Sequence, residues 1–276
     1  MPSILKTALT GLCMKSNLNG VLSVYKPKGM TSRQAATDVQ LLLTKHVWQT
    51  DRPWEVKRKD RVKVGMGGIL DPLAEGVLGK IILLGIGAGC KQLTTYLSGT
   101  KSYVATGKLG QATDTYDTDG KVVETAPTNH INRALLEGAL DRFRGDILQT
   151  PPIYSGLKMK GKRLYEYARQ GKELPGAIEP RPVTLCQANL DGFDSDTQEF
   201  VMTLETSGGF YVRSLVNDMG KAVGSCAHMT KLVRTRQGPW TLDSTLPILD
   251  TMVDEDQKLV MIIGALEPSI DFNQHV

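Results

Sequence analysis

The order of hydrophobic patterns along this chain limits the folds that it can adopt. Segments with the length and composition of strands outnumber segments with helical spacing, and the two kinds do not alternate regularly. Strand-like segments lie at 18–25, 101–107, 183–190 and 200–205. Parallel α/β folds need a regular alternation of strand and helix, whereas an irregular order favours a mixed α+β domain. We therefore expect an α+β fold.

Apolar residues at helical spacing predict the main helices. One helix begins after a cap at Thr31 or Ser32, since either hydroxyl can bond the first turn. Two others cover 131–143 and 212–223. The continuous apolar run 77–84 fits a buried strand or a buried helix segment, which its pattern does not separate.

The chain length of 276 residues corresponds to one or two domains, and 41% hydrophobic residues can supply a large core. The first 19 residues contain Lys6 and Lys15 but neither arginine nor an acidic residue, and their amphipathic pattern is poor. This favours a flexible tail over an organellar presequence. We expect the tail to cover 1–17 and one folded domain to cover 18–276.

The net charge of +4 hides an uneven distribution. Residues 1–70 hold 12 basic and 4 acidic side chains, whereas residues 241–276 hold 1 and 7. The strongest basic cluster, broken only by Asp60, consists of Lys57, Arg58, Lys59, Arg61 and Lys63. Such a concentration indicates a polyanionic partner, and a solvated loop is the simpler alternative.

Signatures of a metal, a nucleotide or a membrane partner are missing from the sequence. The four cysteines are scattered without a C-x-x-C pair, so neither a zinc site nor a redox pair is predicted, and their number suits a reducing compartment. The glycine-rich run 85–91 lacks the Gly-Lys-Ser/Thr ending of a phosphate-binding loop. The longest apolar stretch without charge, 81–90, is too short to span a bilayer.

A lone carboxylate follows three glycines in the segment 64–78. The glycines allow the backbone to approach a ligand closely, and Pro72 fixes the chain direction beside Asp71. The pattern therefore suits a carboxylate placed against a ligand. On these residues alone, an Asp-Pro turn between two strands is the simpler interpretation.

The segment 67–78 closely resembles the catalytic motif of the TruB family of RNA pseudouridine synthases. Further segments are similar to other motifs of that family, in the family's order, at 25–32, 101–103, 113–120, 150–155 and 208–215. The resemblance implies the pseudouridine synthase fold, a mixed and largely antiparallel sheet with flanking helices. We expect no PUA domain, because only 36 residues follow Trp240.

The resemblance implies that the chain isomerises uridine to pseudouridine in RNA, with uridine 55 in the T loop of tRNA as the expected target. The reaction breaks the bond between N1 and C1′, turns the uracil and rejoins it through C5, so we expect no cofactor and no metal. A carboxylate beside C1′ can stabilise or attack the developing cation. The resemblance assigns this role to Asp71, and leaves attack at C1′ and removal of the C2′ proton both open.

The resemblance also assigns roles around the base. Arg213 is expected to pair with Asp71 and to keep the carboxylate ionised. Tyr103 is expected to stack on the extruded uracil and to accept or relay the C5 proton. Tyr211 and Leu232 match positions that line the base pocket, with core packing as the alternative.

The expected partner is tRNA, bound at its T arm by a monomer, with no membrane involved. The target uridine must be flipped out of a folded loop, and phosphate contacts offset the cost. The segment 150–171 resembles the family's RNA-clasping insertion. The cations expected to contact the RNA backbone are Lys158, Lys160 and Lys162 in this segment, together with the basic cluster at 57–63.

One departure from the family pattern bears on substrate choice. Met66 stands where most family members carry His, and it cannot donate a hydrogen bond or carry charge, although it can fill the space near the flipped base. Two alternatives therefore stay open: an RNA-binding or RNA-folding protein with weak activity, and a synthase that acts on T-loop-like hairpins of mRNA. We expect the protein in the nucleus, the cytoplasm or the mitochondrion.

Overall fold

The structure, a computed structural model, describes residues 18–26, 29–68, 80–247, 249 and 253–266. By their contacts these residues divide into two compact units, and the predicted bounds of one folded domain at 18–276 stay a prediction. The first unit combines described residues from 18–97 with those from 237 onward, and the second comprises 98–236. The predicted tail at 1–17 lies outside the described residues.

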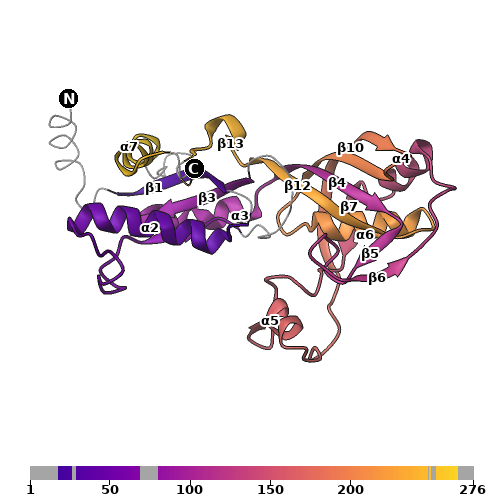
Figure 1. Cartoon of the computed structure of the whole chain (residues 1–276), viewed down its shortest axis with the longest axis horizontal. Helices are drawn as coiled ribbons and strands as arrows, with labels where there is room; N and C mark the ends of the chain where they lie inside the picture. Colours follow the sequence, from indigo (N-terminus) through magenta and orange to yellow (C-terminus); the bar gives the residue numbers. More distant parts are fainter. Residues whose placement is uncertain (1–17, 27–28, 69–79, 248, 250–252, 267–276) are drawn as a thin grey trace, which may run out of the picture. The chain divides into compact units, whose positions relative to one another are not determined.

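A three-stranded antiparallel sheet organises the first unit (Figure 1). β1 (Gly20–Lys26) and β2 (Val64–Met66) pair with opposite edges of β3 (Lys80–Ile86), so the apolar run predicted as strand or helix is a strand over its described part. α2 (Ser32–Trp48) and α7 (Glu255–Ala265) pack on this sheet. The core they share includes Val24, Leu43, Ile82, Leu84 and Ile262.

The sequence around α2 explains where this helix begins and ends. Thr31 lies just before it in extended backbone, and its hydroxyl accepts a hydrogen bond from the N–H of Gln34 at 3.0 Å, which confirms the predicted cap. Gln49 ends the helix in the left-handed region, with φ of 46°. The shorter elements of this unit are η1 (Gly87–Lys91), α3 (Leu93–Ser98), β13 (Trp240–Thr241) and η2 (Leu242–Ser244).

A larger sheet organises the second unit (Figure 1). Its strands lie in the order β12 (Ala227–Gln237), β4 (Lys101–Leu109), β11 (Glu199–Thr206), β10 (Arg181–Asp194) and β7 (Gly145–Gln149). The pairs β4–β11, β11–β10 and β10–β7 are antiparallel.

Two antiparallel hairpins and three helices complete the second unit. The hairpins are β5 (Gln111–Thr113) with β6 (Val122–Thr125), and β8 (Lys158–Met159) with β9 (Lys162–Arg163). The helices are α4 (Arg133–Asp141), α5 (Leu164–Arg169) and α6 (Val212–Ala222). α4 and α6 occupy the two long segments for which helical spacing was predicted.

One hydrophobic core joins the larger sheet to α4 and α6. Residues on β11 alternate strictly between buried and half-buried, as expected for a strand with one face in a core. Its buried face packs with both helices, and the core includes Phe200, Met202, Leu204, Leu136, Leu140, Leu215 and Met219. The predicted mixed α+β fold with a largely antiparallel sheet is confirmed.

Candidate functional site

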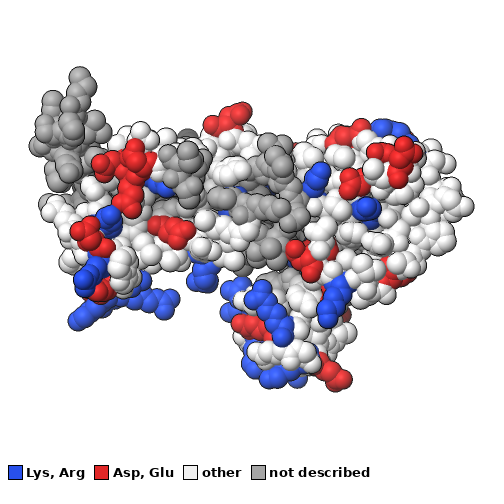
Figure 2. Space-filling model, viewed as in Figure 1, with Lys and Arg blue, Asp and Glu red and all other residues white. Residues whose placement is uncertain are grey.

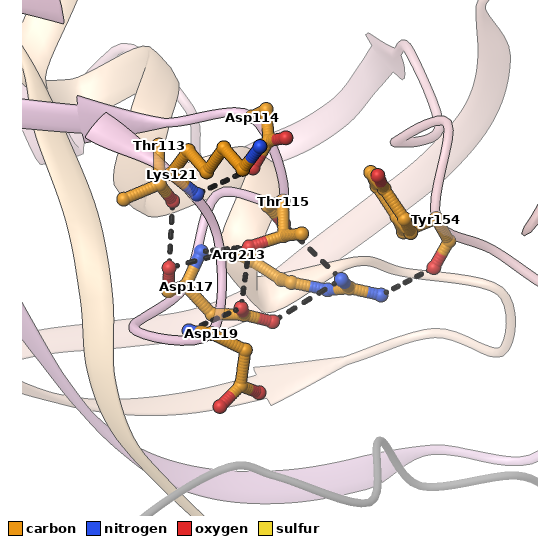
Figure 3. Close-up of polar contacts among 8 residues, drawn as sticks. All are labelled: Thr113, Asp114, Thr115, Asp117, Asp119, Lys121, Tyr154 and Arg213. Carbon is orange, nitrogen blue, oxygen red and sulfur yellow. Dashed lines mark hydrogen bonds and ion pairs between the residues drawn. The ribbon is translucent and has the colours of Figure 1, made fainter. Parts of the chain in front are cut away.

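Arg213 lies in the first turn of α6 and is buried although it is charged. Its side chain is 5% exposed, and the carboxylate of Asp117, which is 7% exposed, lies 3.3 Å from its Nη1 atom. Nη1 also donates to the carbonyl of Thr115 at 3.1 Å, and Nη2 donates to the carbonyl of Tyr154 at 3.0 Å (Figure 3). Acceptors on two separate loops therefore fix the plane of the guanidinium.

The loop between β5 and β6 orients Asp117 toward this guanidinium. The hydroxyl of Thr115 donates to Oδ1 of Asp117 at 2.6 Å, and the N–H of Asp119 donates to the same oxygen at 3.2 Å (Figure 3). The hydroxyl of Thr113 donates to the carbonyl of Asp117 at 2.6 Å. Because Oδ1 is held by the loop itself, Oδ2 is the oxygen that faces the cation.

Asp117 is a candidate site residue that sequence reasoning did not single out. It lies in the segment 113–120, whose three aspartates look alike in the sequence. The structure separates them, because Asp117 is buried whereas Asp114 is half-buried and Asp119 is exposed. No local signal singled it out, because Thr113 and Thr115 flank Asp114 directly as well as preceding Asp117.

The backbone at the start of α6 is held by Gln149 at the end of β7. The side-chain oxygen of Gln149 accepts from the N–H of Tyr211 at 2.7 Å, and its nitrogen donates to the carbonyl of the same residue at 3.0 Å. The hydroxyl of Ser214 donates to the carbonyl of Thr150 at 3.1 Å. The start of the predicted RNA-clasping segment and the start of α6 are therefore fixed to each other.

Tyr103 is buried on β4 and shares a hydrogen bond with Arg234 on the neighbouring strand β12. Burial lowers the pKa of Arg234, and the hydrogen bond to Tyr103 acts in the opposite direction. Lys101 begins the same strand as Tyr103. Burial, together with the charge of Arg234, lowers the pKa of Lys101 to about 8. Two buried cations thus lie close to the tyrosine predicted to contact the base.

The two residues predicted to line the base pocket differ in their surroundings. Leu232 is buried within the large hydrophobic core, as the packing alternative requires, whereas Tyr211 is half-buried. Met66 ends β2 in the first unit, where it is half-buried and packs against that unit's core. Asp71 lies outside the described residues, so its pairing with Arg213 stays a prediction.

The predicted RNA-contacting cations are exposed with one exception. Lys57, Arg58, Lys59 and Lys63 are exposed, but Arg61 is half-buried, and its guanidinium donates to backbone carbonyls of the same loop. The lysines of the β8–β9 hairpin, Lys158, Lys160 and Lys162, are all exposed. Figure 2 shows Lys and Arg gathered over the segment that contains α5 and over the loop that follows α2.

Two other kinds of feature are absent from the described residues. No group of three or more His, Cys, Asp or Glu side chains there is placed to hold a metal ion. Among the helices of this part of the chain, none combines the length and the apolar character needed to cross a membrane.

The chain is similar to known families and to known proteins over most of its length. Residues 55–212 match the N-terminal domain of the TruB family of pseudouridylate synthases, and residues 213–268 match the C-terminal domain of tRNA pseudouridylate synthase B. Pseudouridylate synthase TRUB1 of Mus musculus is 44% identical over 271 residues, which cover 98% of this chain and 78% of that protein.

A bacterial relative and a solved structure extend the comparison. The tRNA pseudouridine synthase B of Shewanella amazonensis is 36% identical over 244 residues, which cover 88% of this chain and 70% of that protein. A chain in the crystal structure of a Cbf5-Nop10-Gar1 complex is 19% identical, with a TM-score of 0.60. That match covers 94% of this chain and 62% of the other, and it shows a shared fold.

Proposed function

Because the chain belongs to the TruB family of pseudouridylate synthases, we propose that it converts uridine 55 in the T loop of tRNA to pseudouridine. The observation that carries this proposal is the buried guanidinium of Arg213, which Asp117 and two backbone carbonyls hold in place. A fixed cation of this kind can orient a catalytic carboxylate and keep it ionised. Relatives named as tRNA pseudouridine synthases support tRNA as the substrate.

In this proposal Asp71 acts at the sugar. Cleavage leaves the electron pair of the N1–C1′ bond on uracil and positive character at C1′, which a carboxylate stabilises or attacks. In the other route, the same carboxylate removes the C2′ proton and gives a glycal. In both routes the uracil anion turns and bonds through C5 to C1′. In the glycal route the carboxylic acid returns its proton to C2′ as this bond forms. In both routes the proton lost from C5 and the proton gained at N1 balance, so the reaction is an isomerisation.

Tyr103 is the proposed contact to the turning base. A guanidinium can only donate, so the phenol oxygen of Tyr103 is the acceptor in its hydrogen bond with Arg234. That bond fixes the position of the phenol oxygen, the atom that accepts or relays the C5 proton in this proposal. The burial of Tyr103 also restricts water, which would otherwise compete with C5 for C1′.

The target uridine sits inside a folded loop, and extruding it costs a few kcal/mol. Phosphate contacts by exposed cations offset this cost. In the second unit the proposed contacts come from the β8–β9 hairpin, whose turn at Lys160 and Gly161 has positive φ at both residues and presents three lysines in a short span.

Replacement of Asp71 by Asn tests the chemistry. We expect Asp71→Asn to abolish release of tritium from tRNA labelled at C5 of uridine, while the Kd for tRNA stays within about twofold of the wild-type value, because the change removes one charge and keeps the shape. Turnover near the wild-type rate in this variant would contradict the assignment.

The RNA range is tested with three substrates: full-length tRNA, an isolated T-arm hairpin and an mRNA hairpin that mimics the T loop. We expect site-resolved pseudouridine at position 55 of tRNA and in the isolated T arm. Modification of mRNA hairpins alone would replace tRNA as the substrate, and binding of all three without modification would identify an RNA-binding or RNA-folding protein.

A further inference from the structure

The loop between α2 and β2 combines exposed indoles with a run of cations. We call residues 49–63 the tryptophan loop. Trp54 within it is 60% exposed, and Trp48 just before it is 50% exposed. Tryptophan side chains are highly buried on average, so two exposed indoles near one loop need an explanation. The exposed run Lys57, Arg58 and Lys59 begins three residues after Trp54.

Hydrogen bonds give this loop a defined shape. The indole N–H of Trp48 donates to the carbonyl of Asp60 at 3.0 Å, which ties the end of α2 to the far side of the loop. Arg61 donates to the carbonyls of Trp54 and Val56, so it draws the backbone of this stretch inward. Pro53 beside Trp54 is buried. The exposed position of the Trp54 side chain is therefore set by bonds made elsewhere in the loop.

The far end of the tryptophan loop is anchored to α2. The N–H of Val62 donates to the hydroxyl of Thr44 at 3.2 Å, and its carbonyl accepts from the side chain of Gln40 at 2.8 Å. A loop fixed at its ends and in its middle loses little conformational entropy when it binds a partner.

The charges of the loop leave a net positive surface. Asp51 lies 3.9 Å from Lys45, and Glu55 lies 3.3 Å from Arg52, so two of its acids are near cations. Within the described part of the chain, no carboxylate lies at ion-pair distance from the three exposed cations at 57–59. An indole beside cations that lack carboxylate partners matches the two features that bind single-stranded nucleic acid: an aromatic face for a base and charges for phosphates.

We propose that the tryptophan loop is an RNA-binding element in which Trp54 stacks on an unpaired or terminal base. In it, Lys57, Arg58 and Lys59 neutralise the adjacent phosphates, while Trp48 and Arg61 hold the loop in shape. This proposal rests on the proposed function, since the RNA it contacts is the tRNA substrate. It adds a base-stacking contact on the first unit to the phosphate contacts of the β8–β9 hairpin on the second.

Affinity and its salt dependence together test the proposal. We expect Trp54→Ala to raise the Kd for full-length tRNA about five- to a hundredfold, because a stacked base is lost, with no change in the slope of log Kd against log salt. A variant carrying Lys57→Gln, Arg58→Gln and Lys59→Gln should raise the Kd and also lower that slope by about 2 to 3. Trp54→Phe, which keeps an aromatic face, should restore most of the affinity.

Fluorescence separates stacking from a general loss of structure. Trp240 is buried, so the response of the exposed indoles dominates any change on binding RNA. We expect tRNA to quench the emission of the wild-type protein, and we expect Trp54→Phe to lose most of this quenching while its circular dichroism spectrum and melting temperature stay unchanged.

Several outcomes would overturn the proposal without touching the proposed function. Wild-type affinity in Trp54→Ala, with pseudouridine still formed in tRNA, would show that Trp54 does not stack on a base of the RNA. A different outcome is that the wild-type protein binds tightly to vesicles that contain phosphatidylserine. If Trp54→Ala abolishes that binding and leaves the Kd for tRNA unchanged, the loop is a membrane-surface element. Absence of any tRNA modification by the wild-type protein would contradict the proposed function itself.

Discussion

At the scale of single residues, the buried pair of Asp117 and Arg213 determines how rigid the site is. Two charges removed from water are costly unless each is fully bonded. Here the guanidinium has carbonyl acceptors in addition to the carboxylate, and the carboxylate has hydroxyl and N–H donors in addition to the guanidinium. Such a network tolerates little displacement, as expected for a group that, in the proposed function, orients the carboxylate of Asp71.

Loss of charge at Asp117 should therefore impair both the fold and the reaction. We expect Asp117→Asn to lower the free energy of unfolding by about 3 to 5 kcal/mol, because it leaves a buried cation without its counter-charge. Urea denaturation measures this loss. Single-turnover assays at saturating tRNA should show a slower rate as well. Asp114→Asn is the matched control, since it keeps an acceptor for the N–H of Lys121 and faces no buried cation.

The sequence indicated Arg213 but not its described partner. Its place in a motif marked the arginine, whereas three aspartates within one short segment are equivalent until the loop is folded. Burial of Arg234 was equally hidden, because a basic residue on a strand normally indicates the solvent face. In the folded chain this arginine is hydrogen-bonded to Tyr103 on the next strand, a tertiary contact that no local pattern reveals.

Lys101 should give the protein an unusual dependence of stability on pH. Its pKa is about 8 in the folded chain and near 10.5 when unfolded, so between these values the unfolded state binds more protons. The contribution of Lys101 to stability therefore rises as pH increases from about 8 to about 10.5, by at most about 1.4 kcal/mol per pH unit. Below pH 8 both states are protonated, and the cost of burying the charge is fully present.

Urea denaturation at pH 7.5 and 9.5 tests this dependence. We expect the stability of the wild-type protein to rise relative to that of Lys101→Met across this interval, because methionine does not titrate. Parallel changes in the two proteins would show that Lys101 titrates near its ordinary value.

At the scale of elements, the pairing of β4 with β11 depends on one glycine. Gly107 lies directly opposite Phe200 in the register of these strands. A Cβ at Gly107 would clash with Cζ of that ring, which is fully buried and cannot move outward. This glycine is required for close approach of an aromatic ring and not for a turn.

We expect Gly107→Ala to destabilise the protein by about 1 to 3 kcal/mol through overpacking. Chemical denaturation measures the change, and Gly192→Ala on β10 is the control, since a Cβ there meets nothing within 4 Å. Adding Phe200→Leu should recover part of the loss, because a smaller side chain makes room. An equal loss of stability in Gly192→Ala would show that the conformational freedom of glycine, and not the space taken by the ring, explains the effect.

Prediction of elements succeeded where local signals agreed. Helix α2 has both a capping hydroxyl and helical spacing, and the strand β11 alternates cleanly. Strand β12 was not predicted, because Lys231, Arg234 and Arg236 interrupt its apolar pattern. Its position is set by tertiary contacts, among them the ion pair of Arg236 with Glu205 at 2.8 Å, which no local pattern reveals.

At the scale of the whole molecule, the two units could not be read from the sequence because the first one is discontinuous. The chain leaves it near residue 97 and returns near residue 237. No linker composition marks either crossing, so length and hydrophobic content favoured one domain. Charge is also distributed by unit, since exposed cations concentrate in the tryptophan loop of one and in the β8–β9 hairpin of the other.

These two basic segments should contribute additively to the salt dependence of RNA binding. Each phosphate that a cation neutralises adds about 0.7 to 0.9 to the slope of log Kd against log salt. We expect replacement of Lys158, Lys160 and Lys162 by Gln to lower the slope by about 2 to 3, as expected for the loop variant. In a protein with both sets of changes, this slope should fall by the sum of the two decreases, because we expect a single bound tRNA to contact both segments. A combined loss no larger than either one alone would mean that the two segments do not bind the same RNA at once.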